Sequence, residues 1–163
     1  MAYSELKDLF REHSILDDIN GILNWDMATY MPERSRGQRM SQIKTIYNYK
    51  KKIFNLIKDK ELFKKINKKE LSSSDRLNFE LMKTKFDYFD NIPFKNIQKK
   101  TLLSIQCEGL WREARKKSNF NLVKKSLSKL VNVIKEESNI LSQKKELSKY
   151  DCLLLNYDRS INT

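Results

Sequence analysis

Few side chains of this sequence could carry catalysis. His13 is the single histidine among 163 residues, so a Ser-His-Asp or Cys-His arrangement would have to use it. Its position between Phe10 and Leu16, on the flank of an apolar helical stripe, favours a structural or surface role. Cys107 and Cys152 lie far apart, and no second imidazole is present to complete a zinc site. We therefore assign no catalytic residue and no metal-binding residue.

Other chemical motifs are absent or ordinary. The three glycines are too scattered to form a phosphate-binding loop. Neighbouring carboxylates occur at Asp17-Asp18, at Glu136-Glu137, and at Asp87 with Asp90. Because these segments are rich in lysine, we expect surface ion pairs worth roughly a few tenths of a kcal/mol, not a catalytic dyad.

Trp25-Asp26 differs from these pairs because a large aromatic residue and an acid stand together where a helix is expected to end. Three arginines follow closely, at Arg34, Arg36 and Arg39. We expect Asp26 to be a partly buried acid held by an arginine or by backbone N–H groups. That role is structural, since an acid that caps and pairs needs no substrate.

Helices must position these residues. Three glycines and two prolines provide too few turns for an all-β protein. Apolar residues recur at steps of three and four, which predicts an all-α fold of about five long amphipathic helices plus a short C-terminal turn. We place the first helix at about 4–24 and the second from 32 onward through 66, with the next break at 71–75. The other three lie at about 74–91, 93–117 and 119–141, and the turn lies within 150–163. We expect residues 1–163 to form a single helical unit.

Several breaks between the helices have a recognisable chemistry. Pro32 suits the first turn of a helix. Ser72-x-x-Asp75 is a capping motif, in which the hydroxyl accepts from an early N–H and the acid lies near the positive helix end. Pro93 ends one helix and can open the next, and Ser118-Asn119 is a cap-type break.

The charge balance is strongly basic. The sequence has 33 Lys plus Arg against 21 Asp plus Glu, a net charge of +12. Most of the basic residues are Lys, which is typical of A/T-rich codon usage, whereas specific phosphate or groove recognition favours Arg. Residues 44–69 contain ten Lys and only two acids, while their apolar residues keep a helical spacing. This segment therefore has a basic face, which is either simply solvated or a patch that binds phosphate or a membrane surface. We expect the solvated face, and not nucleic acid as a partner.

The sequence contains no sign of export. The N-terminus has no basic segment followed by an apolar stretch, and no apolar run approaches the ~18 residues that a membrane span needs. We expect a cytoplasmic protein with both cysteines reduced.

Three ordered blocks carry a family resemblance. The first is Trp25-Asp26, Met31-Pro32, Arg39 and Gln42; the second is W-x-E-A-R followed by Phe120; the third is Y-D-x-L-L followed by Tyr157. Together with Tyr3-x-x-Leu6, they resemble the carboxypeptidase Taq family of metallocarboxypeptidases over nearly the whole chain. The residues of the three blocks, which we expect to be structural, are Trp25, Asp26, Met31, Pro32, Arg39, Gln42, Trp111, Glu113, Ala114, Arg115, Phe120, Tyr150, Asp151, Leu153, Leu154 and Tyr157.

The resemblance implies an all-helical hydrolase that removes C-terminal residues from peptides with a divalent metal, usually zinc or cobalt. In such a protease H-E-x-x-H places two imidazoles on one helix face to hold the metal, and its Glu serves as base for the metal-bound water. One His cannot supply that site, so we expect this chain to bind no cofactor and to be inactive alone. It corresponds to the non-catalytic N-terminal third of the larger fold.

The chain also departs from the family pattern. Where the family reads Y-E-P-G-M-T, this sequence has Tyr157-Asp158-Arg159-Ser160-Ile161-Asn162, and Lys125 stands where the family usually has a proline. These departures favour a separately encoded fragment at least as much as a missing continuation.

Three functions are compatible with these observations. The first is a helical fragment that docks onto a separately encoded catalytic half, with apolar stripes that would otherwise allow a homodimer. The second is a basic helical module that binds nucleic acid or anionic surfaces, and the third is a non-functional relic. The blocks favour the first, because binding a polyanion does not require Trp25-Asp26 or Tyr150-Asp151.

Overall fold

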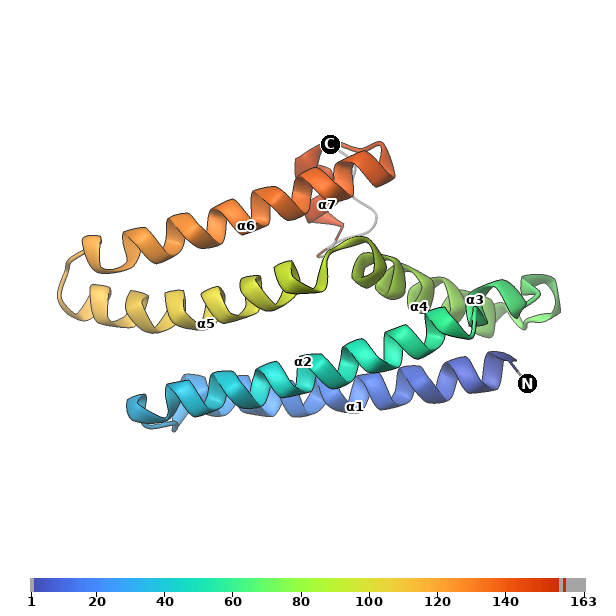
Figure 1. Cartoon of the computed structure of the whole chain (residues 1–163), viewed down its shortest axis with the longest axis horizontal. Helices are drawn as coiled ribbons and strands as arrows, with labels where there is room; N and C mark the ends of the chain where they lie inside the picture. Colours follow the sequence, from blue (N-terminus) through green and yellow to red (C-terminus); the bar gives the residue numbers. More distant parts are fainter. Residues whose placement is uncertain (1, 156, 158–163) are drawn as a thin grey trace. The chain divides into compact units, whose positions relative to one another are not determined.

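The protein is described here by a computed structural model that defines residues 2–155 and 157 (Figure 1). Those residues form seven α-helices, two short 3-10 helices and no strand, so the all-α prediction is confirmed and the helix count roughly matches. The chain divides into two compact units, one up to Asp87 and the other from Tyr88 onward. The expectation that the chain acts as a single helical unit stays a prediction. None of the described helices is both long and apolar enough to cross a membrane.

The first unit is built on a pair of long helices. Its elements are α1 (Ala2–Thr29), η1 (Glu33–Ser35), α2 (Arg36–Asp59), α3 (Leu62–Lys65), η2 (Lys68–Glu70) and most of α4 (Ser73–Asn91). Helices α1 and α2 run antiparallel and side by side (Figure 1), because Asp26 pairs with Arg39 at one end and His13 stacks on Phe54 further along.

Helix α1 is longer than the sequence predicts. It passes through Trp25-Asp26 and ends at Thr29, so the expected end at about residue 24 is wrong. Neither Trp nor Asp breaks a helix. The break comes at Pro32, which has no N–H and disfavours helical backbone in the residue before it. Pro32 precedes the 3-10 turn η1 and not α2 itself.

The lysine-rich segment 44–69 is not one continuous helix. Helix α2 ends at Asp59, and Glu61 adopts a left-handed conformation with φ 50°, which costs an L-residue roughly 1–2 kcal/mol. The reversal returns two apolar side chains to the core. Leu62 is 2% exposed, and the Phe63 ring centroid lies 5.3 Å from that of Phe79. Their burial offsets the strain at Glu61.

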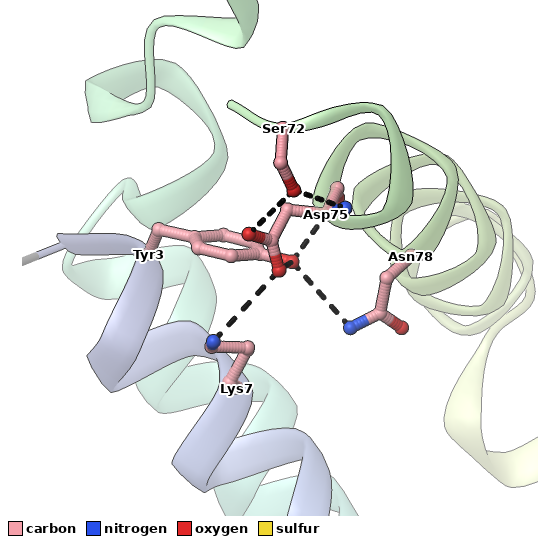
Figure 2. Close-up of polar contacts among 5 residues, drawn as sticks. All are labelled: Tyr3, Lys7, Ser72, Asp75 and Asn78. Carbon is pink, nitrogen blue, oxygen red and sulfur yellow. Dashed lines mark hydrogen bonds and ion pairs between the residues drawn. The ribbon is translucent and has the colours of Figure 1, made fainter. Parts of the chain in front are cut away.

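A capping motif joins the start of α4 to α1 (Figure 2). The Ser72 hydroxyl accepts from the Asp75 N–H at 3.1 Å and donates to the Asp75 carboxylate at 3.0 Å. From α1, the Tyr3 hydroxyl donates to Asp75 Oδ1 at 2.9 Å, and Lys7 Nζ lies 3.8 Å from the same oxygen. Asn78 Nδ2 donates to the Tyr3 hydroxyl at 3.5 Å. The predicted cap is therefore present, and it also fixes α4 against α1.

The second unit is a helical hairpin closed by a short helix. Helices α5 (Phe94–Lys116) and α6 (Asn121–Lys145) lie side by side (Figure 1), and α7 (Lys149–Leu154) follows. Cys107, Ala114 and Val123 form a buried cluster between them. At the turn, Ser118 has φ 48° and Asn119 N–H donates to the Ala114 carbonyl at 2.9 Å, as expected for a helix end in the left-handed conformation.

A buried ion pair fixes α6 within the second unit. Glu137 is 1% exposed, and Tyr88 donates its hydroxyl to Glu137 Oε1 at 2.6 Å. Lys100 Nζ lies 2.9 Å from Oε1 and 2.6 Å from Oε2. The expectation of a surface ion pair is therefore wrong for Glu137. Its side chain lies on the buried side of α6, where the residues one turn before and after it, Val133 and Leu141, are apolar.

Replacing Ser72 by Ala is expected to destabilise the first unit. The substitution removes the acceptor for the Asp75 N–H, and loss of such a cap costs about 0.5–2 kcal/mol. Ser73→Ala is the matched control, since Ser73 is exposed at the first position of α4. Urea unfolding followed by circular dichroism measures both, and equal effects of the two substitutions would contradict the assigned cap.

Candidate functional site

The single histidine is enclosed in the core of the first unit. His13 is 1% exposed, and its ring stacks on Phe54 with centroids 4.5 Å apart. Its Nδ1 lies 3.3 Å from Asp17 Oδ2, but in a direction that makes no regular hydrogen bond. The imidazole is therefore held by packing and has no open path to a substrate.

The Asp17 carboxylate joins three helices. Lys50 Nζ on α2 lies 2.5 Å from Oδ1, and Lys85 Nζ on α4 lies 2.5 Å from Oδ2. Lys50 itself is only 8% exposed. A simple surface ion pair was expected for the Asp17-Asp18 segment, and for Asp17 that expectation is wrong: its carboxylate connects α1, α2 and α4.

The protonation of this cluster follows from burial and charge. Burial lowers the pKa of His13 more than the neighbouring Asp17 carboxylate raises it, and Lys50 and Lys85 lower it further. Burial alone would raise the pKa of Asp17, but the contact with His13 and the hydrogen bonds from Lys50 and Lys85 outweigh burial and hold that pKa well below its usual range. At neutral pH the cluster therefore contains a neutral imidazole, a carboxylate and two ammonium groups.

The first family block connects α1 to α2 through an ion pair and a hydrogen bond. Arg39 pairs with the Asp26 carboxylate and also donates from Nη1 to the Leu23 carbonyl at 3.1 Å. Trp25 is 60% exposed, and its ring meets that of Tyr30 edge-on at 5.7 Å. Among the remaining residues of this block, Met31 is half-buried, whereas Pro32 and Gln42 are exposed.

The second block lies along the last turns of α5. The Arg115 guanidinium lies over the Trp111 ring, 5.2 Å from its centroid. Glu113 accepts from Lys117 Nζ at 2.7 Å, and this hydrogen bond lowers the pKa of the Glu113 carboxyl. Ala114 is buried in the hairpin, whereas Phe120 is 61% exposed. These contacts join near neighbours in the chain and stabilise the end of the hairpin.

The third block begins α7. The Ser148 hydroxyl accepts from the Asp151 N–H at 3.1 Å and donates to its carboxylate at 2.6 Å, so Asp151 serves in a helix cap. Cys152 is 1% exposed, and burial raises the pKa of its thiol. Leu153 and Leu154 are half-buried, while Tyr150 and Tyr157 are exposed. The departures at 158–162 lie outside the described residues.

Sequence reasoning missed two charged residues that the fold buries. Lys50 occupies the buried stripe of α2 between Ile46 and Phe54, and Glu137 occupies that of α6 between Val133 and Leu141. In both cases the charged residue is four positions from the apolar residue on either side. A charge in the apolar phase of a helix is therefore the signal that could have identified them.

The described residues do not fit the zinc or cobalt that the family resemblance implies. They contain no group of three or more His, Cys, Asp or Glu side chains that could hold a metal ion. Next to the only imidazole, both Asp17 oxygens already contact ammonium groups, which would repel a divalent cation.

Stability should depend on pH through His13. Because the folded state lowers the pKa of His13, the unfolded chain binds the proton more readily as pH falls below about 6.5. The free energy of unfolding should then fall with pH, by at most about 1.4 kcal/mol per pH unit for one proton. The contribution from Asp17, whose pKa is also lowered, should be lost only below about pH 3.9.

Urea unfolding between pH 7 and 5 tests this, with His13→Leu as the variant that cannot titrate. Because the chain has one histidine, the variant should show a flatter dependence in this range. An unchanged slope in His13→Leu would contradict the assignment.

Comparison with known proteins places the fold. Residues 5–163 match the carboxypeptidase Taq (M32) metallopeptidase family. The chain is similar to the structure titled "The Structure of CHT", with 22% identity and a TM-score of 0.73. It is also similar to Trypanosoma cruzi metallocarboxypeptidase 1, with 20% identity and a TM-score of 0.79, and to "BsuCP Crystal Structure", with 21% identity and a TM-score of 0.78. No curated protein sequence matches.

These similarities concern a part of a larger fold. Each covers 99% of this chain but only 32–33% of the solved chain, so the chain spans about a third of the length of those proteins. The family match agrees with the resemblance carried by the three sequence blocks. The chain therefore belongs to the carboxypeptidase Taq (M32) metallopeptidase family.

Proposed function

We propose that this chain is a non-catalytic helical part of a metallocarboxypeptidase of this family, inactive alone and acting together with the catalytic part of that fold. The observation that carries the proposal is the state of the single histidine. His13 is buried against Phe54 and faces a carboxylate already bound by two lysines. An H-E-x-x-H site needs two imidazoles facing the same metal, and this chain has one.

The polar groups of the family blocks support a structural role. The Asp26 carboxylate is bound by Arg39, that of Asp151 accepts from the Ser148 hydroxyl, and that of Glu113 is paired with Lys117. Each carboxylate is thus already engaged by a group of its own unit. Groups that are engaged in this way stabilise helices and turns, and are poorly placed to activate water or bind a substrate.

The lysine-rich segment gives less support to a function in polyanion binding. At least four of its ten lysines pair with acids of the same unit: Lys50, Lys60, Lys64 and Lys68. The acids come from α1, from Glu61 and from α4. Neutralised lysines release fewer counterions on binding phosphate, so they contribute less to affinity.

The purified chain should release no C-terminal amino acid from an N-blocked dipeptide, with or without added Zn²⁺ or Co²⁺. The reason is that the chain lacks the two-imidazole site. Amino-acid release is measured by a ninhydrin assay, with a mock purification from cells lacking the chain as control. Release that exceeds the mock, scales with the amount of chain and disappears on chelation would contradict the proposal.

A further inference from the structure

The second unit leaves several large apolar side chains in water along the α5–α6 hairpin. Trp111 on α5 is 46% exposed, and Phe120, Leu127 and Val131 at the start of α6 are 61%, 37% and 39% exposed. All four belong to the unit that begins at Tyr88, so their arrangement is set by the hairpin itself. A group of exposed apolar side chains on one surface is typical of a binding site.

The helical repeat places these side chains on one face of the hairpin. Ala114 of α5 and Val123 of α6 lie in one buried cluster between the helices. Trp111 comes three residues before Ala114, and Phe120, which has helical backbone angles, comes three residues before Val123. Because a helix has about 3.6 residues per turn, this offset turns each side chain by about 60° from the buried direction, in the same sense. The helices of an antiparallel hairpin are related by a two-fold axis perpendicular to their plane, so equal offsets lead to the same face.

Basic side chains border the apolar ones. Leu127 and Val131 continue the same side of α6, and Lys124 and Lys135 lie beside them. Both lysines are exposed and form no ion pair within the described residues. On α5, the Arg115 guanidinium lies over the Trp111 ring. The face therefore combines apolar side chains with positive charges that have no acidic partner.

The acids of the hairpin do not cancel this charge. Glu108 and Glu113 of α5 each pair with a basic residue one turn away, and Glu137 is buried in its ion pair with α5. Glu136 is exposed, but it lies about 140° around α6 from Val131. We call the following residues the hairpin face: Trp111, Phe120, Lys124, Leu127, Val131 and Lys135.

We propose that the hairpin face binds the surface of an anionic lipid bilayer. Amphipathic helices with lysines along their polar side lie in the membrane interface, with their apolar side chains inserted among the lipids. Tryptophan is enriched at this interface because its ring has an apolar body and a polar N–H. Lys124 and Lys135 would then lie beside anionic headgroups, which attract basic side chains. This binding does not depend on the proposed function, because it uses a surface apart from His13.

The mixture of residues favours a bilayer over a nucleic acid. A nucleic acid would neutralise the two lysines through its phosphates, but it would leave Leu127 and Val131 in water. A bilayer accommodates both kinds of side chain, since its headgroups carry the charge and its acyl chains are apolar.

Co-sedimentation of the full chain with lipid vesicles tests the proposal. The chain should pellet with vesicles of phosphatidylcholine and phosphatidylserine and stay in solution with vesicles of phosphatidylcholine alone. Added NaCl should reduce the bound fraction because it screens exposed charges. A chain that stays in solution with both vesicles, whether or not it binds a DNA duplex or an acidic protein, would overturn the proposal. Equal binding to both vesicles would overturn it too.

Tryptophan fluorescence locates the contact. The chain has two tryptophans, so Trp25→Phe leaves Trp111 as the single emitter. Its emission should shift to shorter wavelength when phosphatidylserine vesicles are added, because the ring leaves water. Trp111→Phe retains only Trp25, which is exposed on the first unit, and its emission should not shift. The reverse pattern, or no shift in Trp25→Phe, would contradict the assigned face.

Charge reversal on α6 separates the hairpin face from net charge. Lys124→Glu/Lys135→Glu should weaken binding to phosphatidylserine vesicles by about tenfold or more, since each basic side chain near an anionic surface contributes attraction. Lys125→Glu/Lys129→Glu is the matched control: it changes the net charge equally, and both lysines are exposed on the other side of α6. Circular dichroism checks that both variants stay helical. Equal losses of binding in the two variants would overturn the proposal.

Discussion

The first unit depends on the ion pairs that the partly buried carboxylate of Asp17 forms with two lysines. A charge withdrawn from water must be compensated, and here two ammonium groups from different helices supply the compensation. Lys50 reaches it from α2 and Lys85 reaches it from α4. Moving either helix away from α1 would therefore leave charged groups without their ion-pair partners. The same requirement fixes His13, whose neutral ring is enclosed between this carboxylate and Phe54.

Most of the helices could be predicted from apolar spacing and from caps. The Ser72 cap and the Pro93 boundary are local chemistry, and both are where the sequence places them. The sequence predicts the end of α1 too early, because Trp25-Asp26 resembles a helix boundary when Asp26 is assumed to be a capping residue. The helix instead continues to Thr29. The reversal of the chain at Glu61, two residues after α2 ends, has no local signal. A glutamate rarely adopts a left-handed conformation, and the burial of Leu62 and Phe63 stabilises it here.

The polar and the aromatic residues of the three family blocks take different places in the fold. Their polar members cap or pair, as at Asp26 and Asp151, and these roles require only neighbours within the same unit. Their large aromatic members remain exposed, at Trp25, Trp111 and Phe120. The sequence predicted the first kind of role from charge and spacing, but it could not predict the second, because exposure is decided by what else packs against a helix.

His13, the single imidazole of the chain, is buried against Phe54 beside a carboxylate that two ammonium groups already contact, and we therefore propose that it is neutral at pH 7 and binds no metal. Two-dimensional ¹H–¹⁵N NMR of the histidine ring of the intact chain, recorded during a titration with Zn²⁺, tests it most directly. The account predicts a neutral imidazole at pH 7 whose ring signals do not move as zinc is added. Zinc-dependent displacement of the His13 ring signals at stoichiometric metal would contradict it.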